Sequence, residues 1–278
     1  LSDPVLVRED GTYLYTLPSV VDDGQMGITH VLRGDDHITN TGVQIALFEA
    51  LGYVIPTFGH FNLLTTIDGE GLSKRTGALS LRTLRSEGYE PMAIASLAVL
   101  TGMSGAIEAV PTLDALRDRL DFSGVSASSS KFDLAELKRL NAELVHGLSF
   151  TDVATSLMEW GVPEQDGETF WNAVRGNCTF VADAEIWARA VYAVGPSGAD
   201  FSEDDQNFLR AAFDALPDQP FDNGIWKIWT DSVKAATGRK GKALFMPLRL
   251  ALTGLDHGPE LAELLPLIGR DRTLSRKP

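Results

Sequence analysis

The 278-residue sequence contains a single cysteine, Cys178. One cysteine excludes an internal disulfide and any zinc site built from cysteine thiolates. It also fits a reducing compartment, so we expect the protein in the cytoplasm. The neighbours Asn177, Thr179 and Phe180 offer no base that could activate the thiol. We therefore interpret Cys178 as a buried structural residue rather than a nucleophile.

Long apolar runs are missing as well. The longest spans residues 92–103 and is interrupted by Ser96, Thr101 and Gly102. It is shorter than the about 20 residues that cross a membrane, so it predicts a buried helix, and we expect no membrane partner. The sequence also begins without an initiator methionine or the pattern of a signal peptide. We expect residue 1 to be a cut within a longer protein.

Positive charge is scarce, because 24 lysines and arginines face 38 aspartates and glutamates, for a net charge of −14. A protein that binds RNA places Lys and Arg against phosphates, so this balance argues against such a partner. A basic stripe can nevertheless lie on an acidic body. Three stripes are candidates, each with a solvated surface as its alternative: Arg82 and Arg85; Arg239, Lys240 and Lys242; and Arg270, Arg272, Arg276 and Lys277.

Strand-like segments are confined to the first 80 residues. Residues 5–17 predict a hairpin, and residues 28–33 and 58–65 predict two further strands. Asn40 or Thr41 is expected to cap the helix between these two strands. The strand–helix–strand order predicts a parallel sheet, whose ligands bind beyond the carboxyl ends of the strands.

From residue 81 onward, periodic apolar residues predict a nearly all-helical remainder. Glycine and proline breaks punctuate it, and the clearest linker candidate spans residues 195–199. The predicted helices span residues 81–87, 91–102, 112–119, 133–145, 150–160, 168–175, 183–193, 203–215, 222–237, 242–252 and 258–267.

The first motif with chemical meaning is a basic loop after the second strand, Leu-Ser-Lys-Arg at residues 72–75, with glycines at 69, 71 and 77. When ATP is split between its α- and β-phosphates, charge builds on the departing pyrophosphate. A mobile lysine that meets this charge stabilises the transition state, and flanking glycines let the backbone approach the phosphates. A solvated surface loop with two cations is the alternative interpretation.

The second motif lies at the end of a predicted strand and reads Arg-Gly-Asp-Asp-His over residues 33–37. Arg33 can make a bidentate pair with a carboxylate, and His37 can stack on or hydrogen-bond to a nucleotide. The alternative is a structural turn in which Asp35 and Asp36 support the helix start and pair with Arg33. A metal site is disfavoured, because no second cluster of ligands is at hand.

The order and spacing of the two motifs indicate a family, although each motif alone is ambiguous. With Val21-Asp22-Asp23, Asn40-Thr41, Glu49-Ala50-Leu51-Gly52 and the strand around His60, they closely resemble bacterial glutamyl-tRNA synthetase, a class I enzyme. The resemblance covers essentially the whole chain and continues through Gly88-Tyr89-Glu90-Pro91, Lys131-Phe132-Asp133-Leu134, Arg249-Leu250-Ala251-Leu252-Thr253-Gly254 and residues 264–269.

The resemblance implies an α/β fold, the second half of a Rossmann-like parallel sheet, followed by mostly α-helical domains. Residues 1–80 would form the C-terminal half of the class I catalytic, nucleotide-binding domain, and residues 81–146 the stem-contact domain. Residues 147–278 would form a helical anticodon-binding region, with a possible subdivision near 195–199. In the family such helical domains read the anticodon, so we expect residues 147–278 to bind tRNA.

The resemblance also implies the activity, which is activation of glutamate with ATP and Mg²⁺ and its transfer to the 3′ end of tRNA-Glu. Arg33 would hold the substrate carboxylate, and Lys74 would be the catalytic lysine on the phosphates. Two positions depart from the family pattern: Ser19 stands where asparagine is expected, and Gly71 replaces a basic residue. The implied residues are Tyr15, Arg33 and Ser19 for glutamate; His37, Leu72, Ser73 and Lys74 for ATP; and Gly71, Leu72, Ser73, Lys74 and Arg75 for the signature loop, with no metal ligands.

Part of the family's site is missing from this sequence. The His-Ile-Gly-His-type motif that holds the ATP phosphates does not occur, and neither does a first strand with its glycine-rich turn. Because catalysis of this kind depends on positioning, we expect the chain alone to be inactive and to bind no cofactor alone. The expected partners are glutamate, ATP and tRNA-Glu, with tRNA-Gln left open, and the family makes a monomer the expected state.

Other interpretations are weaker. Glutaminyl-tRNA synthetase carries C-terminal β-barrels, which the helical tail disfavours. A non-catalytic homologue, serving as an RNA-binding or regulatory module, is opposed by the retained Tyr15, Arg33, His37 and Lys74. Anticodon contacts could come from Trp226, Trp229, Phe245 and Arg239-Lys240, with a core role as the alternative for the two tryptophans.

Overall fold

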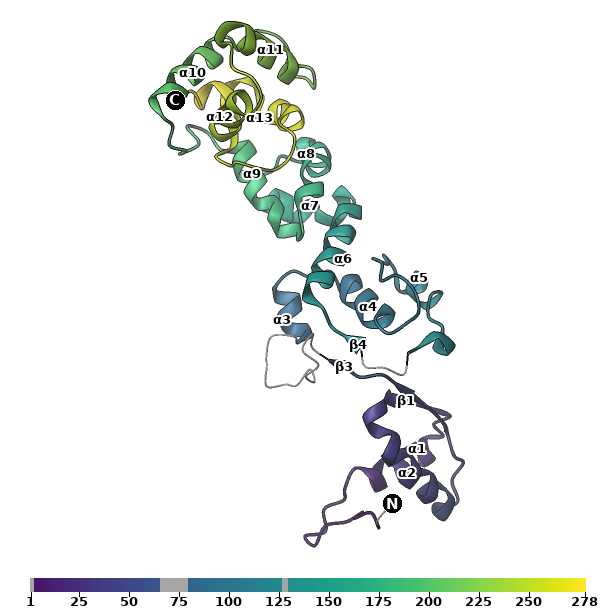
Figure 1. The fold of residues 1–278 in the computed structure, drawn as a ribbon. Helices are drawn as coiled ribbons and strands as arrows, with labels where there is room; N and C mark the ends of the chain where they lie inside the picture. The colour runs from purple at the N-terminus through teal and green to yellow at the C-terminus, as the bar shows by residue number, and fades with distance from the viewer. Residues whose placement is uncertain (1–2, 66–79, 127–129) are drawn as a thin grey trace. The chain divides into compact units, whose positions relative to one another are not determined.

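The computed structural model describes residues 3–65, 80–126 and 130–278 (Figure 1). Most of these residues are helical, and the strands form small parallel sheets, in agreement with the predicted fold class. The chain forms two compact units. The first unit combines Leu1–Thr83 with Pro91–Leu137, and the second combines Leu84–Glu90 with Lys138–Pro278.

The first unit is organised around the predicted strand–helix–strand element. Two strands run parallel, the helix between them connects them, and a preceding helix packs against the connecting helix. In the register of the two strands, Arg33 lies directly opposite His60. The elements are α1 (Thr16–Met26), β1 (His30–Gly34), α2 (Ile38–Leu51) and β2 (Thr57–Phe61).

The predicted hairpin of residues 5–17 is mostly wrong. Only one antiparallel bridge forms, between Val7 and Tyr13. The backbone then enters α1 at Thr16, so the second half of the predicted hairpin does not continue as a strand.

The predicted cap of α2 is also wrong. The helix begins at Ile38, directly after the 3₁₀ turn η1 (Asp35–His37). Asn40 and Thr41 therefore lie inside the first turn of α2, and their side chains are available for other partners.

The strand predicted at residues 58–65 is two strands. β2 ends at Phe61, and β3 (Leu64–Thr65) pairs in parallel with β4 (Ser130–Lys131) instead of extending the β1–β2 sheet. At the break, the side-chain amide of Asn62 donates a hydrogen bond to the hydroxyl of Ser130. This contact ties the break to β4.

Short helices complete the first unit. Its small core includes Leu100, Val110 and Leu116. The helix predicted at residues 91–102 ends at Leu100, because the backbone at Gly102 takes a φ of 100°. The elements are α4 (Pro91–Leu100), α5 (Leu113–Arg117) and η2 (Phe122–Gly124), while α3 (Leu81–Ser86) and α6 (Leu134–Gly147) contribute residues to both units.

The short segment Leu84–Glu90 belongs to the second unit through specific contacts. The ring of Tyr89 meets Phe180 edge-on, with centroids 5.0 Å apart. The buried Asn141 side chain accepts a hydrogen bond from the Glu90 amide at 2.7 Å and donates one to the Thr179 carbonyl at 2.6 Å. One buried amide thus fixes two backbone segments that are distant in sequence.

The second unit is helical in its described residues, and its helices agree with the predicted ones to within a few residues, except at the C-terminal end. There the predicted helix 258–267 is only the first part of a longer element, which Gly269 interrupts with φ 73° and ψ 165°. The elements are α7 (Phe150–Glu159), η3 (Glu164–Asp166), α8 (Gly167–Val174), η4 (Arg175–Asn177), η5 (Val181–Asp183), α9 (Ala184–Tyr192), α10 (Glu203–Asp214), α11 (Ile225–Thr237), α12 (Lys242–Thr253) and α13 (Leu261–Ser275).

The core of the second unit holds large aromatic residues. Trp171 and Trp229 are fully buried, and their indole N–H groups donate to the carbonyls of Leu148 and Ala212, each at 2.8 Å. Cys178 is buried too, and burial raises the pKa of its thiol to about 12. A neutral buried thiol confirms the structural interpretation of this residue. In the parts of the chain that the structure covers, none of the helices is long and apolar enough to span a bilayer.

Gly258 is expected to be sensitive to substitution. A methyl group there would clash with the ring of Trp187, and the backbone φ of 122° disfavours any side chain. We expect Gly258→Ala to lower the free energy of unfolding by about 2–4 kcal/mol, measured by urea denaturation. Gly161, with φ 84° and open space around it, is the matched control, and Gly161→Ala should cost only about 1 kcal/mol. Equal losses would show that the ring contact contributes nothing.

Candidate functional site

The candidate site begins where β1 ends. Arg33 is the penultimate residue of β1, and Gly34 leads into the 3₁₀ turn η1. A side chain at position 34 would clash with the Asp36 carboxylate and would lie 3.2 Å from Leu63 Cδ2. Glycine at position 34 therefore leaves room for the Asp36 carboxylate and the Leu63 side chain.

The Arg33 guanidinium is held by neutral groups. Nη1 donates to the Tyr15 hydroxyl at 3.2 Å, and Nη2 donates to Thr41 Oγ1 at 2.5 Å and to the His37 carbonyl at 3.5 Å. The guanidinium carbon lies 5.3 Å from the centroid of the Phe58 ring. Nε is buried without a hydrogen-bond partner.

The acidic residues of the motif do not neutralise Arg33. Among the described residues, no carboxylate lies within ion-pair distance of it. The interpretation in which Asp35 and Asp36 pair with Arg33 is therefore wrong for this part of the chain. Asp36 lies instead 3.8 Å from His37 Nε2. A cation that neutral groups hold at the carboxyl end of a strand is suited to receive the carboxylate of a ligand.

Tyr15 and His37 complete the cluster around Arg33. Their rings meet edge-on with centroids 5.5 Å apart, and His37 Nδ1 lies 3.1 Å from Asn40 Nδ2. Tyr15 is 54% exposed, so it remains accessible to a ligand. The structure thus brings together three of the residues that the sequence assigns to substrate binding.

Ser19 lies one turn of α1 beyond Tyr15, and its hydroxyl is already engaged. It donates to the Thr16 carbonyl at 3.0 Å and accepts from Gln44 Nε2 at 2.7 Å. The other amide atom of Gln44, Oε1, is buried without a partner. Because the single hydroxyl hydrogen is committed to Thr16, Ser19 can contact a ligand only as an acceptor unless it reorients.

Two residues at this site were not predicted as site residues. Thr41 and His60 meet at 2.9 Å between Oγ1 and Nε2, and Thr41 in turn contacts Arg33. The pairing of His60 with Arg33 depends on strand register, and the orientation of Thr41 depends on where α2 begins. A correct helix start in the sequence would have indicated Thr41, one turn after His37.

The signature loop of residues 71–75 lies outside the described residues, so its predicted members Gly71, Leu72, Ser73, Lys74 and Arg75 stay predictions. Within the described residues, no group of three or more His, Cys, Asp or Glu side chains is placed to hold a metal ion.

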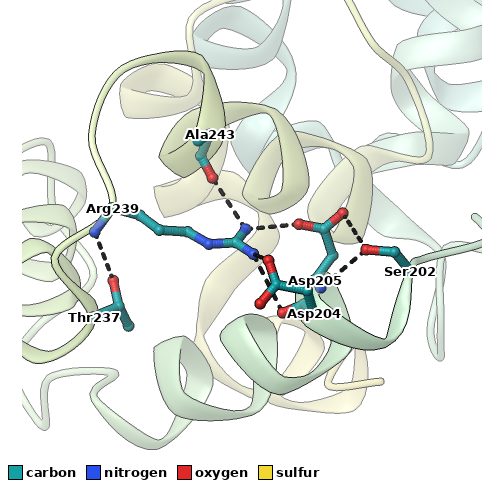
Figure 2. Close-up of polar contacts among 6 residues, drawn as sticks. All are labelled: Ser202, Asp204, Asp205, Thr237, Arg239 and Ala243. Atoms are coloured by element: carbon teal, nitrogen blue, oxygen red, sulfur yellow. Dashed lines mark hydrogen bonds and ion pairs between the residues drawn. The ribbon is translucent and has the colours of Figure 1, made fainter.

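Arg239, from a predicted basic stripe, serves as a brace within the second unit (Figure 2). It lies in the loop between α11 and α12, and its Nη1 donates to Asp205 Oδ1 at 2.6 Å and to the Ala243 carbonyl at 3.2 Å. Nη2 pairs with the Asp204 carboxylate, and the guanidinium carbon stacks 4.3 Å from the Phe208 ring centroid. The Arg239 hydrogen bond holds the pKa of Asp205 below its usual value. In this stripe, Lys240 and Lys242 are the exposed members.

The C-terminal stripe is also used internally. Arg276 is only 3% exposed and donates to the carbonyls of Leu252, Val191 and Ala193 at the ends of α12 and α9. The negative ends of the two helix dipoles stabilise the cation there. Burial lowers the pKa of Arg276 to about 10, which leaves it charged at neutral pH. The other members bind locally: Arg270 to the Pro217 carbonyl, Arg272 to the carbonyls of Leu267 and Ile268, and Lys277 to Asp214.

The aromatic candidates for anticodon contact are mostly structural. Trp229 is fully buried, which confirms its core interpretation. Trp226 is half-buried and packs against Trp229 and Phe245, with ring centroids 6.0 and 6.1 Å away. Phe245 is 39% exposed, and Lys234 Nζ lies 5.8 Å from its ring centroid.

Two family models match the chain. Residues 1–139, half of the chain, match the catalytic domain of class I tRNA synthetases (E and Q). Residues 174–276 match an anticodon-binding domain. The chain therefore belongs to the class I tRNA synthetase family for E and Q, glutamate and glutamine.

Curated relatives and solved structures agree with this family. The chain is 58% identical to glutamate–tRNA ligase 1 of Brucella ovis and 59% identical to that of Chelativorans sp., over the whole chain and 61% of each relative. A glutamate tRNA ligase from Elizabethkingia meningosepticum, in complex with its amino acid, superposes with a TM-score of 0.83 at 25% identity. That match covers 99% of this chain and 61% of the other. The chain thus spans less than two thirds of these relatives.

The brace at Arg239 generates a stability prediction. We expect Arg239→Gln to lower the free energy of unfolding by about 1–3 kcal/mol, because the change removes a charge-assisted contact and leaves Asp205 without its cation. Urea denaturation of the chain measures this change. Lys240→Gln, at the exposed neighbour, is the control and should change stability by less than about 0.5 kcal/mol. If both variants unfold alike, the brace contributes nothing to stability.

Proposed function

We propose that this chain acts as part of a longer glutamate–tRNA ligase, which activates glutamate with ATP and transfers it to the 3′ end of tRNA-Glu. The observation that carries the proposal is the position of Arg33 and the neutral groups around it. Arg33 stands at the carboxyl end of β1, Tyr15 and Thr41 hold it, and no carboxylate of the described chain neutralises it. The high identity to curated glutamate–tRNA ligases supports the same assignment.

The proposed roles follow the chemistry of the reaction. A carboxylate oxygen of glutamate attacks the α-phosphorus of ATP and pyrophosphate leaves; a ribose hydroxyl of the tRNA then attacks the activated carbonyl and AMP leaves. Arg33 and Tyr15 would bind a glutamate carboxylate, and Ser19 would line the same pocket. His37 would lie against the nucleotide, and Leu72, Ser73 and Lys74 would bind the phosphates, with Lys74 meeting the charge on pyrophosphate. Mg²⁺ would enter with ATP as part of the substrate.

The proposed division of the chain follows these roles. Residues 1–80 would belong to the catalytic domain, residues 81–146 to a stem-contact domain, and residues 147–278 to an anticodon-binding region that could divide near 195–199. The match of residues 174–276 to an anticodon-binding domain supports the last assignment. We further propose a monomer that acts in the cytoplasm, with tRNA-Glu as its RNA and tRNA-Gln as a second candidate. The retained cluster around Arg33 disfavours a purely non-catalytic module.

The activity prediction compares two proteins. With tRNA-Glu present, the full-length enzyme should catalyse glutamate-dependent exchange of pyrophosphate into ATP, whereas the 278-residue chain alone should show no exchange above background. The reason is that positioning dominates this chemistry, and an incomplete phosphate site positions little. The absence of glutamate-dependent exchange in the full-length enzyme would refute the proposed function. Robust exchange by the chain alone would refute the need for further residues.

The RNA prediction concerns the second unit. In filter binding, the chain should retain a tRNA-Glu transcript more tightly than an unrelated tRNA. The double variant Lys240→Ala/Lys242→Ala should weaken binding and reduce the slope of log K against log salt by about 1–2, because each lysine lost removes a phosphate contact. An unchanged urea midpoint controls for unfolding. Equal retention of both tRNAs by the unmodified chain would count against an anticodon-binding role.

A further inference from the structure

A threonine and a histidine stand behind the arginine of the candidate site. Thr41, from the first turn of α2, is 9% exposed, and His60 lies on β2 directly opposite Arg33. Arg33 Nη2 reaches Thr41 Oγ1 at 2.5 Å, and Thr41 Oγ1 lies 2.9 Å from His60 Nε2. Two elements of the fold thus converge on one side of the guanidinium.

The donor and acceptor groups of each side chain fix the direction of the contact between Arg33 and Thr41 and leave two arrangements for the contact between Thr41 and His60. Arginine only donates, so Thr41 Oγ1 must accept from Arg33. The single hydroxyl hydrogen then goes to His60 Nε2, if that nitrogen is unprotonated, or to the His37 carbonyl at 3.2 Å, if His60 donates instead. In both cases the hydroxyl hydrogen of Thr41 is committed to a protein acceptor, and its oxygen accepts a hydrogen bond from Arg33.

At the other terminal nitrogen of Arg33, Nη1, the described residues provide a longer and more exposed contact. There Tyr15 accepts from Nη1 at 3.2 Å, and its side chain is exposed. A long arginine side chain has many rotamers, and binding a carboxylate with a fork of two hydrogen bonds requires one of them. Phe58, two residues before His60 and on the same face of β2, lies under the guanidinium at 5.3 Å. On the Nη2 side, the short polar contact that selects the rotamer comes from Thr41 at 2.5 Å, and the contact with the His37 carbonyl is longer, at 3.5 Å.

We infer that Thr41, supported by His60, is a positioning residue that holds Arg33 in the orientation that binds the glutamate carboxylate. This inference rests on the proposed function and adds two residues to it. Neither residue needs to touch the substrate. Their loss should weaken glutamate binding while the chemical step and the ATP site stay nearly intact, because a misplaced guanidinium still carries its charge but no longer meets the carboxylate in register.

The test is a matched pair of variants in the full-length enzyme, measured by pyrophosphate exchange in the presence of tRNA-Glu. Thr41→Val keeps the shape of the side chain and removes the hydroxyl, and we expect the KM for glutamate to rise about 10- to 100-fold with the KM for ATP unchanged. Thr41→Ser keeps the hydroxyl and should stay within about threefold of the unmodified enzyme. An unchanged KM for glutamate in Thr41→Val would overturn the inference.

His60 provides the second arm of the test. His60→Phe should raise the KM for glutamate several-fold, and the double variant Thr41→Val/His60→Phe should be no worse than Thr41→Val alone, because both act through one contact. Fully additive effects would overturn the proposed route. If Thr41→Val does not fold, as judged by circular dichroism, Thr41→Ser and His60→Phe carry the test. Failure of the unmodified enzyme to exchange pyrophosphate would instead refute the proposed function, so the two outcomes are distinguishable.

Discussion

The parallel pairing of β1 with β2 is the constraint on which the candidate site depends. It sets Arg33 opposite His60 and brings the carboxyl ends of both strands to the same edge. Other elements add their residues at that edge: η1 carries His37, and the first turn of α2 carries Thr41. A shift of one residue in the register would turn the side chains of the shifted strand to the opposite face of the sheet, and the cluster around Arg33 would not form.

The sequence was informative where periodicity or a motif carried the signal. The strand–helix–strand unit and the helical second unit follow from periodicity, Arg33 and His37 belong to a motif, and Tyr15 was expected beside them only through the family resemblance. The sequence was misleading where contacts between residues distant in the chain determine the ends of strands and helices. The strand predicted at 58–65 breaks at Asn62, whose side chain donates a hydrogen bond to Ser130, a residue far along the chain. Helix α2 starts before the predicted cap because a 3₁₀ turn leads directly into it. Thr41 resembles a helix cap in sequence, but its hydroxyl faces Arg33 instead.

Net charge proved a poor guide to the use of individual cations. Arg239 and Arg276 both looked like parts of a basic surface, yet one binds two aspartates and the other binds the carbonyls of two helix ends. Guanidinium groups suit such tasks because they make several hydrogen bonds in fixed directions. An acidic protein with few cations thus uses several of its arginines to hold helices together. Lys240 and Lys242, by contrast, are exposed, as suits a compact ammonium group that stays in water.

The pairing of β3 with β4 has a consequence for the order of folding. Leu64 and Thr65 lead directly into the segment that contains Lys74, and their strand partner is Ser130–Lys131. During synthesis on the ribosome, Leu64 and Thr65 are therefore made well before their strand partner is available. Closing so long a loop costs entropy and slows the step. The β1–β2 pair, joined through a single helix, closes a much shorter loop. The β1–β2 pair and the cluster around Arg33 can thus assemble first, and the β3–β4 pair follows only after the chain has reached residue 131.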